Sequence, residues 1–205
     1  MNGGYDDGYA ACECFWGHDA SSLVRELETH VQSFDGLRVF DAGCGEGKNA
    51  AYVAARGAEA TGVDISELAI TNFRKGVPPI PHCSLFVGDI RELLLPIAEF
   101  DIVIAYGLLH CLRDRTEIDE VVTKLQKATA TNGWNVVCAF NDRFQELSAH
   151  PGFTPKLLPH ADYLAMYSGW ELIHASDSDL TETHPHNGIV HTHSMTRILA
   201  RKVTQ

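Results

Sequence analysis

Short apolar runs alternate, up to about residue 140, with stretches whose apolar residues recur at helical spacing. Continuous runs such as Phe100–Ala105 are typical of strands that are buried on both faces. The helical stretches show spacings such as that of Leu23, Leu27 and Val31. The pattern predicts strands over Leu37–Ala42, Ala58–Asp64, Cys83–Val87, Phe100–Ala105 and Trp134–Phe140, and helices over Asp19–Phe34, Glu46–Arg56, Ser66–Lys75 and Asp114–Thr129.

The pattern changes after Phe140. A loop over Pro151–Pro159 precedes a predicted helix over Ala161–Tyr167, a strand over Trp170–Ala175 and a long final strand over Ile189–Lys202. Regular strand–helix alternation implies a doubly wound parallel sheet, to which the last two strands would add a hairpin. The predicted fold class is therefore α/β, a doubly wound Rossmann-like, seven-stranded and mainly parallel sheet with an antiparallel C-terminal strand.

Length and charge narrow the possible partners. The chain has 205 residues, enough for one domain with a full-size core, and a formal charge of −11. A surface this acidic repels phosphate backbones, so nucleic acid is not an expected partner. No apolar run approaches the roughly 20 residues that span a bilayer, and the N-terminus has no signal-peptide pattern. We therefore expect a cytoplasmic protein without a membrane partner, with its six cysteines reduced.

Three glycines between the first two predicted strands, Gly43, Gly45 and Gly47, form the most informative motif, and Asp41 precedes them. Glycines at this turn allow a tight bend and let the backbone approach an adenosine-containing ligand. A dinucleotide-binding turn would have the spacing Gly-x-Gly-x-x-Gly, which the chain misses by one position. A phosphate loop is also excluded, because the spacing from Gly43 to Lys48 is one residue too short.

The order Asp-x-Gly-x-Gly-x-Gly over residues 41–47 resembles the first motif of class I S-adenosylmethionine-dependent methyltransferases. Three further motifs follow in register: Gly62-Val63-Asp64, Gly88-Asp89-Ile90 and Phe100-Asp101-Ile102-Val103. Phe15-Trp16-Gly17-His18 and the segment Thr196–Lys202 look like small bacterial methyltransferases of the tellurite-resistance and thiopurine type. The resemblance implies S-adenosylmethionine as the cofactor and a small-molecule acceptor, often methylated at a sulfur or chalcogen atom.

The resemblance also assigns roles to residues at the strand ends. Asp64 would bind both ribose hydroxyls, and Asp89 would contact the adenine amino group. Asp41 would act through a water or through backbone geometry near the amino-acid end of the cofactor. For each of these carboxylates an ordinary loop or surface role is the alternative. The expected cofactor-binding residues are Asp41, Gly43, Gly45, Gly47, Asp64, Ile65, Asp89, Ile90, Tyr106 and Trp16.

The candidate catalytic residue is His110, which follows the fourth predicted strand. Methyl transfer is an in-line displacement that depends mainly on holding donor and acceptor aligned in a dry site. His110 could be a general base or a substrate contact, and a histidine packed at a helix start is the alternative. Tyr9 and Trp16 could belong to a lid or to a packed arm. The expected substrate contacts are Tyr9, His110, His191 and His193.

Four histidines, His184, His186, His191 and His193, fall close together near the C-terminus. Alternate residues of a strand face the same side, so His191 and His193 would share a face with Arg197. These histidines could line a substrate pocket, bind a metal ion or have structural roles. Because the resembled family needs no metal, we expect no metal ligands.

We therefore expect one methyltransferase domain over residues 1–205, with an arm or lid over 1–18, a cofactor-binding core over 37–142 and a substrate-side segment with the final hairpin over 150–205. It would transfer a methyl group in line to a small molecule at an undetermined S, chalcogen, O or N centre, as a monomer or homodimer. A non-catalytic S-adenosylmethionine-binding regulator or scaffold is one rival. A nucleotide-dependent oxidoreductase is another, which the glycine spacing disfavours.

Overall fold

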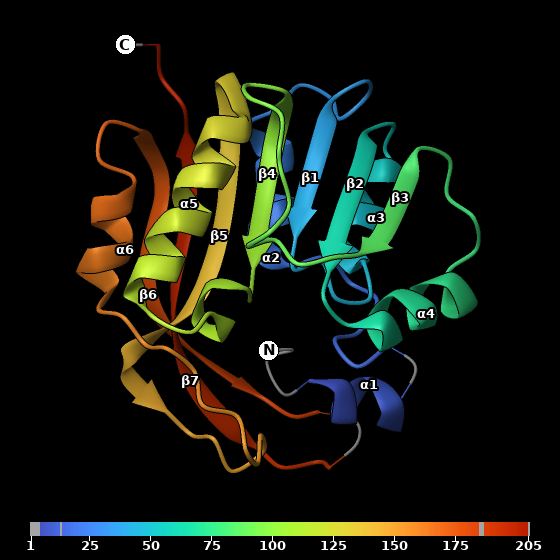
Figure 1. The fold of residues 1–205 in the computed structure, drawn as a ribbon, viewed down its shortest axis with the longest axis vertical. Helices are drawn as coiled ribbons and strands as arrows, with labels where there is room; N and C mark the ends of the chain where they lie inside the picture. The colour runs from blue at the N-terminus through green and yellow to red at the C-terminus, as the bar shows by residue number, and fades with distance from the viewer. Residues whose placement is uncertain (1–4, 13, 185–186, 205) are drawn as a thin grey trace.

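The described part of the chain, residues 5–12, 14–184 and 187–204 of a computed structural model, folds around a seven-stranded sheet (Figure 1). The strands are β1 (Arg38–Ala42), β2 (Glu59–Asp64), β3 (Cys83–Val87), β4 (Phe100–Tyr106), β5 (Thr129–Gln145), β6 (Glu171–Glu182) and β7 (His191–Arg201). Their order in the sheet is β3-β2-β1-β4-β5-β7-β6. The pairs among the first five strands are parallel, whereas β7 is antiparallel to both neighbours.

Helices cover both faces of this sheet (Figure 1). One face packs against α2 (Ser22–Glu26), η1 (Leu27–Thr29), α3 (Lys48–Ala54) and part of α4 (Glu67–Gly76). The other face packs against α5 (Arg115–Ala128) and α6 (His160–Met166). β4 supplies both cores, because Ile102 and Ile104 face one layer while Val103 and Ala105 face the other. The two cores hold the carboxyl ends of the parallel strands in one rigid row.

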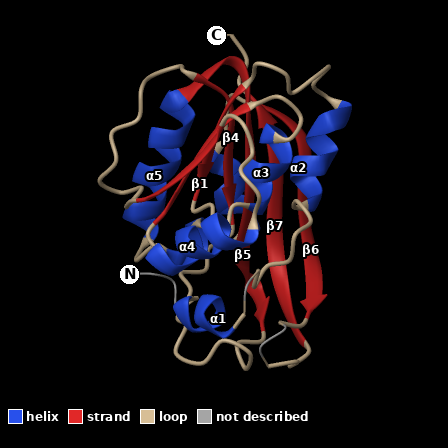
Figure 2. Ribbon diagram, turned by 90° about the vertical axis from the view of Figure 1, so that its right-hand side faces the viewer, coloured by secondary structure: helices blue, strands red, loops and turns tan. Residues whose placement is uncertain are grey.

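β6 and β7 form a long hairpin that continues past the carboxyl ends of the parallel strands (Figures 1 and 2). Their pairing runs from Glu171↔Arg201 to Glu182↔His191. A short helix, α1 (Asp6–Ala11), lies beyond α4 at the same edge of the sheet (Figure 2). The single turn η2 (Leu109–Cys111) follows β4 there. Segments from both ends of the chain therefore surround the row of strand ends.

The predicted fold class is confirmed. The differences from the sequence prediction are two short elements that were not predicted, α1 and η2, and the lengths of others. The helix predicted over Asp19–Phe34 is shorter, since the backbone N–H of Ser21 donates to Asn49 Oδ1 (2.9 Å) outside any helix, and the helix ends in a 3₁₀ turn at Thr29. β6 continues to Glu182 instead of ending at Ala175. Its extra residues are mostly polar, and their pairing with β7 rather than apolar alternation keeps them extended.

No helix within the described ranges is both long and apolar enough to cross a membrane. All six cysteines are free thiols.

Candidate functional site

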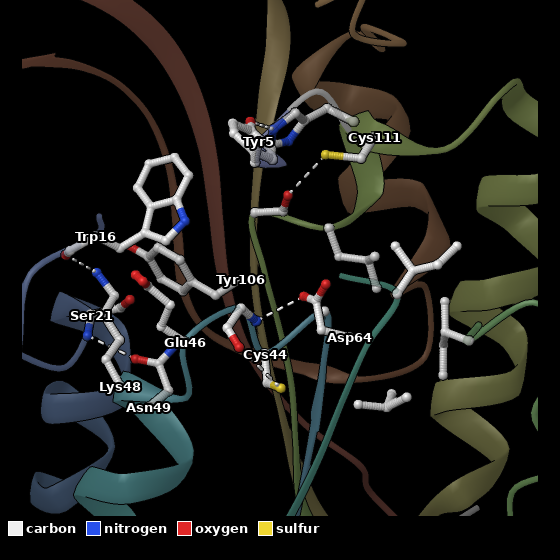
Figure 3. A pocket seen from close by; sticks show the side chains of 18 of the residues that line it. Tyr5, Trp16, Ser21, Cys44, Glu46, Lys48, Asn49, Asp64, Tyr106 and Cys111 are labelled. Carbon is white, nitrogen blue, oxygen red and sulfur yellow. Dashed lines mark hydrogen bonds between the residues drawn. The ribbon is translucent and has the colours of Figure 1, made fainter. Parts of the chain in front are cut away.

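A cavity of about 350 Å³ lies at the carboxyl edge of the parallel strands (Figure 3). Gly43, Gly45 and Asp64 line one part of it, which we call the glycine end. Glu182 and Arg197 from the β6–β7 hairpin line another part, the hairpin end. Ligands of open α/β sheets bind in crevices at this edge, where the strand order reverses. The cavity is therefore the candidate site.

The turn after β1 builds the glycine end. The backbone N–H groups of Gly43 and Cys44 both donate to the Val63 carbonyl, at 2.8 and 3.0 Å, which ties the turn to β2. Gly45 has φ +54°, and a Cβ there would lie 3.0 Å from the hydroxyl of Tyr9. The backbone at Gly45 is therefore left bare toward the cavity, as the sequence predicts for a close approach to a ligand.

Gly47 has a different role from the predicted cofactor contact. It does not line the cavity. A Cβ on it would lie 2.3 Å from the Leu85 side chain and 2.9 Å from Phe73, with the backbone at φ +75°. Gly47 therefore allows α3 and α4 to pack closely against the sheet.

Asp64 ends β2 and uses both carboxylate oxygens to organise the glycine end. Oδ2 accepts a hydrogen bond of 2.8 Å from the Gly45 N–H, and Oδ1 accepts one of 2.9 Å from the Ser66 N–H. Burial raises the pKa of Asp64, while these amide donors oppose the rise. Each oxygen keeps lone-pair capacity toward the cavity, so the carboxylate can still accept hydrogen bonds from a ligand.

Asp41 lies beneath the turn rather than in the cavity wall. It is 1% exposed, and neither carboxylate oxygen has a hydrogen-bond partner among the described residues. Burial, together with the charge of Asp64, raises its pKa to about 8. Lys48 opposes the rise. Asp41 is thus a buried acid below the glycine end and outside the cavity lining, a position compatible with the predicted action through a water or through backbone geometry.

Asp89 lines the cavity with its neighbour Ile90, and Ile65 lines it from the end of β2. The Asp89 carboxylate accepts hydrogen bonds from Arg91, including one of 2.8 Å from Nε. The adjacent guanidinium lowers the pKa of Asp89. This wall therefore carries an ionised acid whose position is fixed by Arg91.

An N-terminal arm, residues 5–12 and 14–18, covers the cavity with Tyr5 and Trp16 (Figure 3). Tyr9 of the same arm also lines the cavity. Trp16 Nε1 donates to the Tyr9 hydroxyl (3.1 Å), and Tyr5 meets Trp16 edge-on at 5.1 Å between ring centroids. Two side chains hold the arm by its backbone. Lys48 Nζ donates to the Trp16 carbonyl (3.0 Å), and Asn72 Nδ2 donates to the Tyr9 carbonyl (2.8 Å). The arm is therefore an anchored aromatic cover.

Aromatic and charged side chains line the hairpin end. Tyr106 from β4 and Phe140 from β5 contribute rings, and Met195 contributes a flexible apolar chain. Burial raises the pKa of Tyr106 to about 12, so its hydroxyl stays protonated. The guanidinium of Arg197 donates to Ser178 Oγ at 2.6 Å. Burial also raises the pKa of Glu182, against the effect of nearby cations.

His110 lines the cavity but is 1% exposed. Its Nδ1 accepts the Phe140 backbone N–H at 3.2 Å, so its own hydrogen sits on Nε2, which lies 3.4 Å from the Tyr5 hydroxyl. The ring stacks on Phe140 with centroids 4.0 Å apart. Burial and the neighbouring His193 and His150 lower the pKa of His110 to about 3. The neutral ring can donate toward the cavity through Nε2, while Nδ1 is occupied.

The terminal histidines predicted as substrate contacts do not line the cavity. His191 and His193 are fully buried at the start of β7, and His193 stacks on the face of Phe140 at 4.1 Å between centroids. His184 lies close to His191, with ring centroids 4.8 Å apart. The predicted member His186 lies outside the described residues.

Several residues at this site escaped the sequence analysis. Arg197 could have been identified, because it shares one strand face with His191 and His193 and follows them at even spacing. Glu182 had no such signal, since only the folding of the hairpin brings it to the cavity, and neither did His150, which the loop after β5 places beside the cavity. The other cavity-lining polar residues that were missed include Tyr5, Ser21, Ser22, Glu46, Lys48, Asn49 and Arg91.

Comparison with known proteins agrees with this geometry. Residues 39–133 match the family model described as a methyltransferase domain. Magnesium-protoporphyrin O-methyltransferase from Rhodobacter capsulatus is 35% identical over 147 residues, which cover 67% of this chain and 64% of that protein. The chain thus spans less than two thirds of the length of this curated relative.

Solved structures share the fold. TehB from Haemophilus influenzae superposes with a TM-score of 0.72 at 18% identity, over 89% of this chain and 62% of TehB. A protein described in the conversion of a disulfide bond into a thioacetal group during echinomycin biosynthesis gives 0.72 at 23% identity, over 100% and 94%. Magnesium protoporphyrin IX methyltransferase from Synechocystis PCC 6803, with bound S-adenosylhomocysteine (SAH), gives a TM-score of 0.66 at 19% identity, over 88% of this chain and 80% of that protein. Residues 39–133 therefore form a methyltransferase domain, and the motifs and the sheet around it are those of class I S-adenosylmethionine-dependent methyltransferases.

Proposed function

We propose that this protein transfers the methyl group of S-adenosylmethionine to a small-molecule acceptor. The observation that carries the proposal is the continuity of the cavity, which joins the glycine end to the hairpin end. A protein that only binds the cofactor needs the glycine end alone. A second compartment beside it, walled by Tyr106, Phe140 and Arg197, gives an acceptor room next to the donor.

The residues at the glycine end fit the proposed cofactor. Gly43 and Gly45 let its amino-acid part approach the backbone, and Asp64 has acceptor capacity for two ribose hydroxyls. Asp89, in the wall of the cavity, would accept a hydrogen bond from the adenine amino group. When bound, S-adenosylmethionine supplies an electrophilic methyl group on a sulfonium centre. The spacing of the glycine motif, which is not that of a phosphate loop, suits this phosphate-free ligand.

The arm and the aromatic walls supply the remaining requirement, which is a dry and aligned site. Trp16 and Tyr9 cover the glycine end, while Tyr5 and Phe140 flank His110. Excluding water and restricting the acceptor to one approach direction are the main contributions a protein can make to in-line displacement.

The guanidinium of Arg197 at the hairpin end favours an acceptor that reacts as an anion, against the opposing carboxyl group of Glu182. Arg197 faces the cavity there, and His110 has its free hydrogen on Nε2, which makes it a hydrogen-bond donor rather than a base. A carboxylate, phenolate or thiolate needs no proton acceptor in the transfer step. The oxygen acceptor implied by the name of the Rhodobacter relative is consistent with this class.

The test has two stages. Calorimetry with S-adenosylmethionine, SAH and NAD measures which ligand the protein binds. The formation of SAH as a reaction product is then measured with a panel of carboxylates, phenols, thiols and neutral amines. We expect SAH binding and turnover with anionic acceptors. Binding without turnover on any acceptor would favour the regulator or scaffold, and NAD binding without SAH binding would favour the oxidoreductase.

A further inference from the structure

Four histidines meet where the β6–β7 hairpin closes over the loop after β5. We call His150, His184, His191 and His193 the histidine cluster. Their relative exposures are 8%, 2%, 0% and 0%, so all four imidazoles are removed from solvent. Neighbouring ring centroids lie 4.8 Å (His184–His191), 4.8 Å (His191–His193) and 5.0 Å (His150–His191) apart. The cluster is adjacent to the cavity and separate from its lining.

The tautomer of His191 follows from its backbone partner. Its Nδ1 lies 2.8 Å from the Ile189 carbonyl oxygen, which can only accept. The ring hydrogen is therefore on Nδ1, and Nε2 presents a lone pair. That Nε2 is buried without a hydrogen-bond partner among the described residues, and its ion-pair neighbour Glu182 Oε1 lies 3.9 Å away.

His193 is oriented in the same way by Gln145. The Gln145 Nε2 donates to the carbonyls of Asn141 (2.8 Å) and Ser194 (2.9 Å), which leaves Oε1 as the acceptor facing His193 Nδ1 at 2.7 Å. His193 therefore also holds its hydrogen on Nδ1, with a bare Nε2 that has no partner within the described ranges.

The other two histidines lie beside this pair, His150 in one group of close ligand atoms with His191 and His193, and His184 in a second group with His191. His150 Nε2 and His184 Nε2 lie 3.2 Å apart. Two nitrogens bound to one tetrahedral ion at about 2.0–2.1 Å are separated by roughly 3.3–3.4 Å. One ligand atom each from His150, His191 and His193 lies within 4.8 Å of the others, and the same holds for Glu182, His184 and His191.

We propose that His150, His184, His191 and His193 bind one divalent first-row transition-metal ion, next to Glu182 at the hairpin end of the cavity. Neutral imidazole is the preferred ligand of Zn²⁺ and its neighbours in this series. An Nδ1–H bonded to a carbonyl, with Nε2 on the metal, is the arrangement that protein metal sites use. The proposal replaces the expectation from the sequence that the chain binds no metal, and it does not depend on methyl transfer.

The competing explanation is a set of structural histidines bridged by one another or by a buried water. Hydrogen bonds between the rings need donors, yet His191 and His193 both direct acceptors inward. A water could donate to two of them. A metal ion would use all the inward lone pairs at once, which is why the shared orientation favours it. The same site would connect the hairpin to the arm, because His184 stacks on Phe15 at 4.6 Å between centroids.

The first experiment uses the full chain with any affinity tag removed, stripped by chelator and then titrated with Zn²⁺ and with Co²⁺. We expect one Zn²⁺ per chain by elemental analysis, and a higher thermal midpoint that chelator reverses. Co²⁺ should give the intense visible bands of a four-coordinate site, without the near-ultraviolet thiolate band that binding to Cys12 or Cys14 would produce. Zn²⁺ should displace the Co²⁺ spectrum.

The variants separate ligands from their surroundings. His191→Gln removes a ligand, and His174→Gln is the matched control, since His174 is hydrogen-bonded to Glu26 (3.1 Å) outside the cluster. Gln145→Leu keeps all four ligands but removes the outer partner of His193, for which we expect about 10–100-fold weaker Zn²⁺ binding. His191→Gln should weaken Zn²⁺ binding by a larger factor than Gln145→Leu, and His174→Gln should leave the Zn²⁺ affinity unchanged.

Two results would overturn the proposal. One is the absence of stoichiometric Zn²⁺ and of the Co²⁺ spectrum in the wild-type chain, a result that needs no variant. The other is unchanged Zn²⁺ affinity in a folded His191→Gln or Gln145→Leu variant, as judged by circular dichroism. Either outcome would leave the water-bridged or structural arrangement as the better description.

Discussion

Gly45 donates its backbone N–H to the carboxylate of Asp64 over 2.8 Å, which joins the turn after β1 to the end of β2. The bond fixes the two parts of the glycine end relative to each other before any ligand arrives. The same carboxylate holds the Ser66 N–H, and thereby the start of α4. Pre-arranged groups of this kind lose little entropy on binding.

Asp64→Asn should weaken SAH binding by at least about tenfold, or roughly 1.4 kcal/mol, because a neutral amide accepts hydrogen bonds less strongly than a carboxylate. Calorimetry measures the change. Asp101→Asn is the matched control, since Asp101 also accepts a backbone N–H, that of Arg38 (2.9 Å), but at the opposite edge of the sheet. Equal affinities for the two variants would contradict the assigned role.

Gly47→Ala and Gly45→Ala should separate stability from binding. At Gly47 a methyl group clashes with Leu85 in a left-handed backbone, so unfolding free energy should fall by about 1–3 kcal/mol or more. At Gly45 the methyl group points at the Tyr9 hydroxyl, so SAH affinity should fall as well. Urea denaturation and calorimetry report the two quantities.

Gly76→Ala is the control for these glycines, because a Cβ there meets nothing within 4 Å. It ends α4 and should be neutral or stabilising by about 0.5–1 kcal/mol. If Gly47→Ala were as stable as Gly76→Ala, the packing role of Gly47 would be refuted.

The buried Asp41 should make stability depend on pH. Its pKa is raised from 3.8 to about 8, so the unfolded chain loses the proton first as pH rises. Between these values the contribution of Asp41 to stability should fall by up to about 1.4 kcal/mol per pH unit, and then level off above about pH 8. The measurement is urea denaturation of the ligand-free wild type and Asp41→Asn from about pH 5 to about pH 8.5. The difference between the two proteins isolates Asp41, and a constant difference would contradict the prediction.

Lys48→Met should loosen the arm. The variant keeps the apolar stem of the side chain and removes the 3.0 Å hydrogen bond to the Trp16 carbonyl. A hydrogen bond to a charged group contributes about 1.5–3 kcal/mol, so SAH release measured by stopped flow should be about tenfold faster or more.

Lys202→Met is the control for the arm variant. Lys202 Nζ also donates to backbone carbonyls, those of Gln126 (2.8 Å) and Thr129 (2.7 Å), at the far edge of the sheet. Its release rate should match the wild type. Identical rates for all three proteins would mean that the arm does not limit release.

Arg197→Met should raise KM for an anionic acceptor by about tenfold, equivalent to about 1.4 kcal/mol, while SAH affinity stays within a factor of about two. Arg201→Met is the control on the same strand, where the side chain lies against Trp134 away from the cavity. Steady-state kinetics with the best acceptor measures both. A change in SAH affinity without a change in KM would assign Arg197 to the cofactor instead.

The position of Asp64 and of the glycine turn at one edge of the sheet could be predicted from the sequence, because each depends on a short stretch of neighbouring residues. Asp64 and the glycine turn each follow a strong apolar strand, and parallel strands bring their carboxyl ends to one edge. The start of the helix predicted from Ser66 is also correct, since the Ser66 Oγ accepts the Ala69 N–H at 3.1 Å and caps α4. Such features depend on a few neighbouring residues and a known topology.

The hairpin end could not be predicted because it depends on long-range contacts and on polar strands. Tyr5 reaches His110 across 105 positions of the chain. β6 beyond Ala175 alternates between exposed and half-buried residues without an apolar pattern, so only its ladder with β7 reveals it as a strand. Glu182 and His150 enter the site through that ladder and through the loop after β5. Such long-range contacts leave no periodic pattern in the local sequence.

The position of β7 between β5 and β6 has a consequence for synthesis. β6 emerges from the ribosome before its only sheet neighbour in the described fold, and it must wait for residues 191–201 with both edges unpaired. β1 and β2, which carry the glycine end, are complete long before. A nascent chain can therefore acquire the cofactor half first, while the acceptor half and the histidine cluster form only when the last strand inserts.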